Sequence, residues 1–233
     1  MARSPGLIVA LDTADPSQAA AWAGRLASQA GLFKLGLEFF IANGPDGVRR
    51  FGQPVFLDLK LHDIPATVAG AVRAALPLAP RLLTVHATGG AAMVAAARHA
   101  AEAAGEARPQ VLAVTVLTSL DDQALAATGI AGRPADQVLR LAGLALAAGA
   151  DGLVCSPHEV ALLRSAFGEA PLLVVPGIRP RGAEVQDQAR TMTPAEAIAA
   201  GADWIVVGRP ITAAADPAAA AAAIRREMDA AAG

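Results

Sequence analysis

The sequence has a single cysteine, Cys155, so no disulfide can form within the chain. This cysteine lies in the apolar run DGLVCS, where such a residue is usually a small buried hydrophobe. The absence of a disulfide framework is typical of proteins in a reducing compartment, and we therefore expect a cytoplasmic protein.

The chain also lacks a large net charge and long apolar segments. The formal net charge is −2 over 233 residues, and no cluster of lysine and arginine is dense enough to indicate nucleic-acid binding. No segment approaches the roughly 20 apolar residues of a membrane span. The apolar run before Asp12 covers only about five residues and no cleavage pattern follows it, so we expect neither a membrane segment nor a signal peptide.

What is present is a core-forming chain, 54% hydrophobic, in which short apolar runs alternate with helix-compatible segments. The runs span residues 6–12, 32–38, 54–60, 82–88, 111–118, 152–156, 172–179 and 204–209. They are hydrophobic nearly throughout, as in parallel strands covered on both faces. Eight such units without a linker predict one catalytic domain over residues 1–233, a (β/α)8 TIM barrel.

A doubly wound open sheet is the alternative fold. It is less favoured because no G-x-G-x-x-G follows the first run and because the strand–helix units are so even. Two helix starts are also predicted, at Thr193-Pro194 and at Asp216-Pro217, the second before an alanine-rich final helix.

Polar residues end almost every predicted strand. Active sites of TIM barrels lie at the carboxyl ends of the strands, so these side chains should converge on one mouth. They are Asp12, Lys34, Asp58, Lys60, Asp63, His86, Thr118, Ser119, Arg179 and Arg209, with the backbone of Gly208 next to Arg209. No Cys/His group has metal-ligand spacing, and neither a Ser-His-Asp arrangement nor a cofactor fingerprint is present, so we expect no metal and no cofactor.

The charged residues of FLDLKLHDIPATV (56–68) interrupt an apolar run where burial should be deepest. Alternate residues of a strand share a face, so Asp58 and Lys60 are predicted to point the same way. A structural ion pair would explain them, but the many polar residues at the other strand ends favour a functional site.

The last two strands carry a candidate phosphate site. VVGRP (206–210) offers Gly208 and Arg209 where barrels commonly bind phosphate. The polar segment after the seventh run contains Arg179 and Gln188 and is either a lid over a phosphate or a solvated loop. The residues alone thus predict a small phosphorylated substrate handled by lysines and aspartates, and they leave the reaction open.

DLKLHDIP (58–65) resembles the signature of the orotidine 5′-phosphate decarboxylase family. Further segments resemble motifs of that family in the same order and cover essentially the whole chain. They are VALD (9–12), FKLGLE (33–38), VHATGG (85–90), VTVLTS (114–119), VPGIRP (175–180), DQART (187–191) and VVGRPI (206–211). D-x-K-x-x-D by itself is shared with sibling barrels, whereas the ordered set is specific.

The resemblance implies cofactor-free decarboxylation of orotidine 5′-monophosphate to UMP, the last step of de novo UMP biosynthesis. In that reaction Lys60 stabilises and then protonates a carbanion at pyrimidine C6, with Asp58 beside the departing carboxylate. Lys34 and Asp63 complete the charge network. The resemblance also implies a homodimer in which Asp63, with Thr67 beside it, reaches the site of the partner subunit.

The same resemblance implies the substrate contacts. Asp12 and Lys34 bind ribose hydroxyls, and Thr118 or Ser119 contacts the pyrimidine, with Thr118 favoured. Gln188, Gly208 and Arg209 hold the phosphate, and Arg179 lies close by.

Two rival functions share part of the pattern. Sibling enzymes acting on sugar phosphates carry D-x-K-x-x-D but use Mg²⁺, typically have a carboxylate where this chain has Lys34, and lack the following I-P. A catalytically inactive nucleotide-binding protein is the second rival, which the intact charged cluster disfavours.

The histidines and tryptophans of the chain are assigned supporting or structural roles. His86 either supports the charged network from a second layer or has no part in it, and His62 either supports its loop or faces solvent. We expect a surface position for His99 and a helix-capping or surface role for His158. We also expect Trp22 to pack between helix and barrel, and Trp204 to lie at the start of the last strand.

Overall fold

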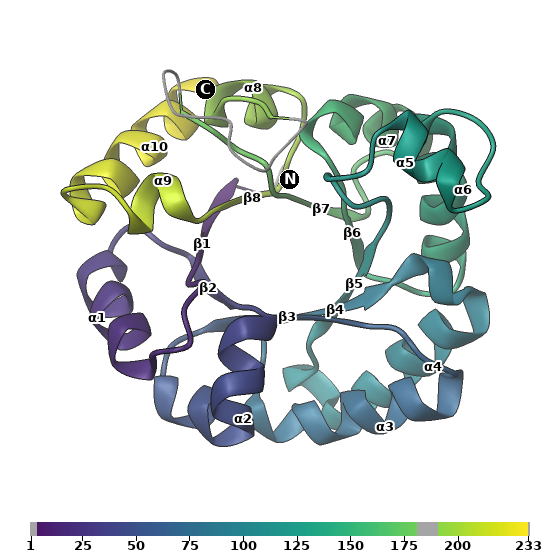
Figure 1. Cartoon of the computed structure of the whole chain (residues 1–233), viewed down its shortest axis with the longest axis horizontal. Coiled ribbons are helices and arrows are strands. Elements are labelled where there is room, and N and C mark those ends of the chain that lie inside the picture. The colour runs from purple at the N-terminus through teal and green to yellow at the C-terminus, as the bar shows by residue number, and fades with distance from the viewer. Residues whose placement is uncertain (1–3, 181–190, 233) are drawn as a thin grey trace.

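Eight parallel strands close into a barrel, with helices around the outside, in the computed structural model of the chain (Figure 1). The structure describes residues 4–180 and 191–232. The strands are β1 (Gly6–Ala10), β2 (Leu32–Leu35), β3 (Val55–Leu61), β4 (Leu82–His86), β5 (Gln110–Val114), β6 (Gly152–Val154), β7 (Leu172–Val175) and β8 (Trp204–Val207).

Helices follow the strands and cover the outer face of the barrel (Figure 1). They are α1 (Pro16–Leu26), α2 (Leu37–Phe51), α3 (Pro65–Ala75), α4 (Ala91–Ala101), α5 (Asp122–Ala127), α6 (Pro134–Ala147), α7 (Val160–Phe167), α8 (Pro194–Ala199), α9 (Arg209–Thr212) and α10 (Pro217–Ala232). Short 3-10 helices are η1 (Leu76–Leu78), η2 (Ala87–Gly89), η3 (Glu102–Ala107) and η4 (Pro157–Glu159).

The first and last strands pair with each other, which closes the sheet. Gly6 lies opposite Trp204 and Val9 opposite Val207 in the parallel β1–β8 ladder. A side chain at Gly6 would overlap the Trp204 ring, so glycine at this position lets the large indole pack across the seam. The predicted barrel is confirmed, and the open-sheet alternative is wrong.

Except for β3, the strands are shorter than the apolar runs that predict them. The run 32–38 divides at Gly36, and helix α2 begins at Leu37. Strand β7 likewise ends at Val175, four residues before Arg179. Inter-strand hydrogen bonds stop where the chain turns outward toward its helix, although apolar residues continue to pack. Lys34, Asp58, Lys60 and His86 lie within strands. The other polar residues predicted at strand ends lie on loops or, for Arg209, in the first turn of α9.

Side-chain caps fix both predicted helix starts. The hydroxyl of Thr193 and the carboxylate of Glu196 form a capping box at the start of α8. The Asp216 carboxylate accepts hydrogen bonds from the backbone N–H groups of Ala218 and Ala219 at the start of α10. Both predictions are confirmed.

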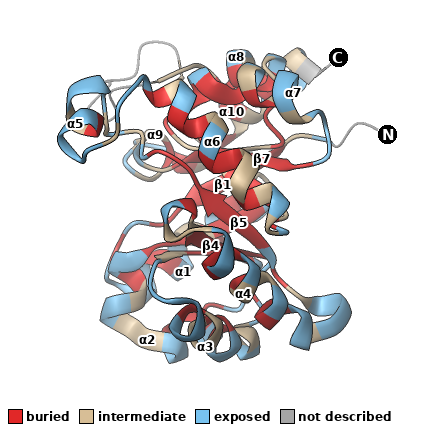
Figure 2. Ribbon diagram, turned by 90° about the vertical axis from the view of Figure 1, so that its right-hand side faces the viewer, coloured by how far each residue is buried: buried red, intermediate tan, exposed pale blue. Residues whose placement is uncertain are grey.

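Buried residues form an inner and an outer layer. Figure 2 shows buried residues along the strands, whereas the exposed positions lie mainly on the surrounding helices and loops. The outer layer packs between strands and helices and includes Phe39 and Met93. The inner layer fills the barrel, so the barrel is a packed core and not a pore. Phe56 belongs to this inner layer and also lines the floor of the pocket described below.

The cysteine, the two tryptophans and two of the histidines lie where the sequence predicts them. Cys155 is buried, Trp22 packs against the outer core, and Trp204 begins β8. His99 and His158 are exposed, as predicted. Among the helices of the described residues, none has both the length and the apolar character needed to cross a membrane.

Candidate active site

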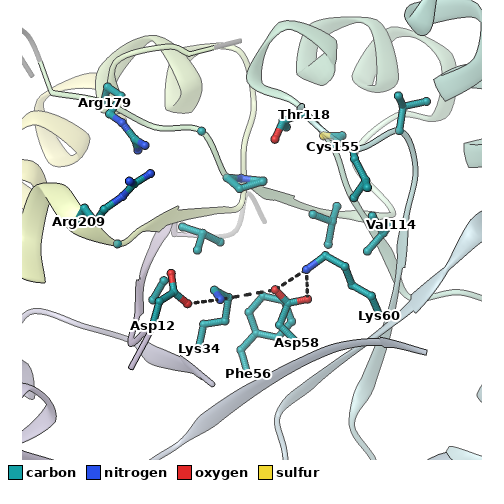
Figure 3. Close-up of a pocket in the computed structure, with 18 residues that line it drawn as sticks. Asp12, Lys34, Phe56, Asp58, Lys60, Val114, Thr118, Cys155, Arg179 and Arg209 are labelled. Carbon is teal, nitrogen blue, oxygen red and sulfur yellow. Dashed lines mark hydrogen bonds and ion pairs between the residues drawn. The ribbon is translucent and has the colours of Figure 1, made fainter. Parts of the chain in front are cut away.

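A cavity of about 260 Å³ opens at the carboxyl ends of the strands (Figure 3). Seven of the eight strands, or the loops directly after them, contribute to its lining. Polar groups at its wall include Asp12, Lys34, Asp58, Lys60, Thr118, Arg179 and Arg209. Parallel strands that close into a barrel present all their carboxyl ends on one face, and so they gather residues that are far apart in the sequence.

Four charged side chains form a continuous row of alternating sign along one side of the cavity. Lys34 Nζ lies 3.0 Å from Asp12 Oδ1 and 3.7 Å from Asp58 Oδ2. Lys60 Nζ donates hydrogen bonds to both carboxylate oxygens of Asp58, at 2.9 Å each. We call Asp12, Lys34, Asp58 and Lys60 the charge row (Figure 3).

Lys34 and Lys60 are the only lysines of the chain, whose other basic side chains are arginines and histidines. Lys34 is the more enclosed of the two, with 13% of its side chain exposed against 33% for Lys60. An ammonium is a compact charge that can also donate a proton, which a guanidinium cannot do in proteins. Both lysine ammonium groups of the chain thus lie at this cavity.

The backbone at Lys60 departs from the regular strand that the sequence predicts. Its φ is +49°, in the left-handed region that residues other than glycine rarely adopt. The β3–β4 register shifts between Leu57 and Leu61, which marks an irregularity in β3. Asp58 and Lys60 meet as predicted, and their contact occurs at a local distortion of the strand.

Thr84, on β4, lies behind the charge row and is not among the site residues predicted from the sequence. Its hydroxyl donates to Asp58 Oδ1 at 2.9 Å and accepts from the backbone N–H of Lys60 at 2.9 Å. Thr84 is fully buried. Its place two residues after Leu82, which belongs to the inner layer, is the signal that could have indicated an inward side chain.

The Asp58 carboxylate is held ionised by its neighbours. Burial acts to raise its pKa, and the positive charges of Lys34 and Lys60 act to lower it. Hydrogen bonds from Lys60 and Thr84 add to the lowering, and the net result is a pKa below the usual carboxyl value. At neutral pH the row therefore contains a buried anion between two ammonium groups.

Two arginines approach each other at another part of the cavity, away from Lys60 (Figure 3). Burial, and then the charge of Arg209, lower the pKa of Arg179. The Arg179 Nε is buried and has no hydrogen-bond partner among the described residues. Two guanidinium groups held together in this way favour an anion between them. Gly208 lines the wall here, whereas Gln188 lies outside the described residues.

Thr118 lines the cavity and Ser119 does not, which supports the choice of Thr118 for contact with a ligand. Asp63 and Thr67 are absent from the lining and lie on an exposed segment at the start of α3. The Asp63 carboxylate accepts a hydrogen bond from the N–H of Ile64, at 2.6 Å, and Ile64 itself is 66% exposed. Neither residue joins the pocket of its own chain.

His86 faces a second cavity, of about 230 Å³, on the other side of Val116 and Leu117. Its ring stacks on that of exposed His62, with 5.3 Å between centroids, and its Nδ1 lies 2.7 Å from Thr88 Oγ1. Burial, and then the charges of His62 and Lys60, lower the pKa of His86. The described contacts of His86 do not reach the carboxylates of the charge row; the residue behind that row is Thr84.

The described residues contain no group of three or more histidine, cysteine, aspartate or glutamate side chains arranged to hold a metal ion. The anionic residues of the charge row are instead matched by ammonium groups. The geometry therefore provides an ammonium that can stabilise and protonate a nearby anion, and a separate pair of guanidinium groups for a second anionic group.

Comparison with known proteins identifies the relatives of this chain. The sequence model described as "Orotidine 5′-phosphate decarboxylase / HUMPS family" matches residues 5–224. A curated orotidine 5′-phosphate decarboxylase of Gluconobacter oxydans is 56% identical, over 98% of this chain and 99% of its own length. One from Anaeromyxobacter dehalogenans is 59% identical, over 96% and 98%.

Solved structures agree with the sequence comparison. The crystal structure of orotidine 5′-phosphate decarboxylase from Lactobacillus acidophilus superimposes with a TM-score of 0.83 at 39% identity, covering 97% of this chain and 99% of that one. A protein from Pyrococcus horikoshii described by the same name has a TM-score of 0.78 at 24% identity, which bears on the fold alone.

Proposed function

The chain belongs to the orotidine 5′-phosphate decarboxylase / HUMPS family, and from this premise we propose that its charge row drives the decarboxylation of orotidine 5′-phosphate. The chain is a carboxy-lyase that forms UMP from orotidine 5′-phosphate in pyrimidine biosynthesis. The proposed role of the charge row rests on one observation, the contact of Lys60 Nζ with both oxygens of buried Asp58.

Lys60 is the proton donor of the proposed reaction. The bond between pyrimidine C6 and the carboxylate breaks, CO₂ leaves, and the electron pair stays on C6. That pair lies outside the π system of the ring, so resonance stabilises it little and a fixed positive charge must do so. The Lys60 ammonium then gives its proton to C6, which forms UMP, and the lysine regains a proton from solvent.

The other members of the charge row hold that ammonium ready. Asp58 binds the Lys60 ammonium through both carboxylate oxygens and lies beside the departing carboxylate of the substrate. Lys34 offsets the negative charge that two neighbouring carboxylates bring together, and with Asp12 it binds the ribose hydroxyls. An arrangement that exists before the substrate binds needs no reorganisation during the reaction.

The two arginines form the phosphate end of the proposed site. Arg209 and the backbone of Gly208 bind the phosphate, with Arg179 beside them and Gln188 as a further ligand. The phosphate is remote from C6, yet energy from its binding can be used to assist the chemical step. Thr118 contacts the pyrimidine.

A second subunit completes the site in this proposal. Asp63 and Thr67 reach the active site of the partner in a homodimer. Their exposure, and their absence from the pocket of their own chain, support that assignment. A twofold contact would exchange the same residues in both directions and so complete two sites.

The sibling Mg²⁺-dependent enzymes are the alternative within the same family. They typically have a carboxylate at the position of Lys34, whose ammonium here contacts Asp12 and Asp58. A carboxylate in place of Lys34 would leave Lys60 as the only cation among three carboxylates. The presence of Lys34 therefore favours the metal-independent reaction.

The proposal is tested by incubating the purified chain with orotidine 5′-phosphate and following the loss of substrate absorbance, with UMP identified by chromatography. Lys60→Ala is expected to abolish turnover, and Arg226→Ala on the outer surface of α10 serves as the matched control. Turnover of a pentulose or hexulose phosphate, without turnover of orotidine 5′-phosphate, would assign the chain to the sibling reactions.

A further inference from the structure

Thr84 joins the two central residues of the charge row through a single oxygen atom. The Lys60 N–H can only donate a hydrogen bond, so it must use a lone pair of the threonine hydroxyl. The hydrogen of that hydroxyl is then directed to Asp58 Oδ1, which can only accept when ionised. The bond from the lysine backbone therefore fixes the direction of the bond to the aspartate.

The two hydrogen bonds of Thr84 lie at the distorted part of β3. Lys60 holds a backbone conformation that is unfavourable for a residue with a side chain, and such a conformation persists only when its surroundings impose it. The ladder between β3 and β4 shifts its register at this place. Thr84 lies on β4 and supplies a side-chain acceptor to the distorted segment of β3.

We infer that Thr84 is a positioning residue for decarboxylation, one that sets the Lys60 ammonium against the Asp58 carboxylate without touching the substrate. This inference rests on the proposed function. Thr84 is fully buried behind the row and does not line the cavity, so it acts through the two residues it binds. Displacement of a reacting group by about 1 Å can reduce a rate roughly 100-fold, so even a small shift of Lys60 would be measurable.

The test compares three variants with the wild type. Thr84→Val keeps the shape and removes both hydrogen bonds, and Thr84→Ser keeps the hydroxyl. Thr115→Val is the matched control, because Thr115 is a buried threonine directly after the neighbouring strand β5, and its hydroxyl donates to the Val154 carbonyl at 3.0 Å. Any general cost of removing a buried hydroxyl appears in both valine variants.

We expect Thr84→Val to lower kcat by about 10- to 100-fold, while KM changes little because the phosphate end of the site is intact. Thr84→Ser should restore most of kcat, and Thr115→Val should leave it near the wild-type value. Loss of the Thr84 bond should also raise the pKa of Asp58, moving the acidic limb of the kcat profile to higher pH. A purely structural role would not move that limb.

Equal kcat values and equal acidic limbs in Thr84→Val and Thr115→Val would overturn the inference, as would a rise in KM with kcat unchanged. If Thr84→Val does not fold, the smaller Thr84→Ala and Thr84→Ser variants provide the same comparison. A wild-type protein that does not consume orotidine 5′-phosphate would instead refute the proposed function, so the two failures are distinguishable.

Discussion

Lys60 places its ammonium 2.9 Å from both oxygens of the Asp58 carboxylate while its own backbone is in the left-handed region. Regular strand geometry would give the two side chains a common face but would not by itself set this bidentate contact. The distorted backbone, the second ammonium of Lys34 and the hydroxyl of Thr84 together hold one buried carboxylate in place. The behaviour of this carboxylate and its partners can be measured.

Removal of divalent metal should leave the reaction unchanged. We expect the purified chain to convert orotidine 5′-phosphate to UMP at the same initial rate before and after dialysis against EDTA, because Lys60 supplies the stabilising charge. Absorbance assays with and without added Mg²⁺ measure this. Activity that disappears in EDTA and returns with Mg²⁺ would point to the sibling enzymes.

Arg209→Ala should weaken the binding of UMP and have little effect on orotidine, which lacks the phosphate. Loss of a hydrogen bond to a charged group costs about 1.5–3 kcal/mol, which corresponds to a loss in affinity of roughly 10- to 100-fold or more. Titration calorimetry of both ligands measures the difference, with Arg226→Ala as the control. Equal losses for the two ligands would mean that Arg209 has a structural role only.

A mixture of two inactive variants should regain decarboxylase activity if Asp63 crosses a dimer interface. In a mixed dimer of Lys60→Ala and Asp63→Ala chains, one site carries both lesions and the other carries neither. Random assortment of equal amounts makes about half of the dimers mixed, which gives roughly a quarter of wild-type sites. Each variant alone should stay far below that activity.

Native mass spectrometry is the necessary control for this mixture, because subunits must exchange before sites can recombine. Once mixed dimers are observed, a mixture as inactive as its parents would mean that Asp63 acts within its own chain. A fully active Asp63→Ala protein would remove this residue from the site altogether.

The stability of the folded chain should depend on the ionisation of Asp58. The pKa of this carboxyl is lower in the folded than in the unfolded state, so its stabilising effect is fully present above the unfolded value of about 3.9. The effect is lost as the pH falls from there through the folded pKa. We therefore expect the free energy of unfolding of the wild type to drop in this acidic window.

Asp58→Asn should be less stable than the wild type at neutral pH, where it leaves two ammonium groups without their carboxylate. The difference between the two proteins should shrink as the pH falls below about 4. Urea unfolding at fixed protein concentration from pH 3 to 7 measures this, with the exposed Asp46→Asn as the control. A stability difference that stays constant over this range would contradict the expected linkage.

The barrel and most of the side chains at its mouth could be predicted from the order of the residues alone. Eight apolar runs of strand length, separated by segments with helix-start signals such as Thr193-Pro194, leave few other arrangements. Once parallel strands close, their carboxyl ends must share one face. The convergence of Asp12, Lys34, Lys60 and Arg209 on one cavity could therefore be predicted without coordinates.

The way these side chains are held depends on packing between segments that are distant in the chain. The left-handed backbone of Lys60 and the contacts of Thr84 depend on the register of β4 against β3, which joins residues 24 and 26 positions apart. The outward position of Asp63 likewise depends on how the chain leaves β3 to begin α3. Local sequence encodes propensity and periodicity, whereas register and loop direction are set by packing between segments distant in the chain, because only packing selects among conformations of similar local energy.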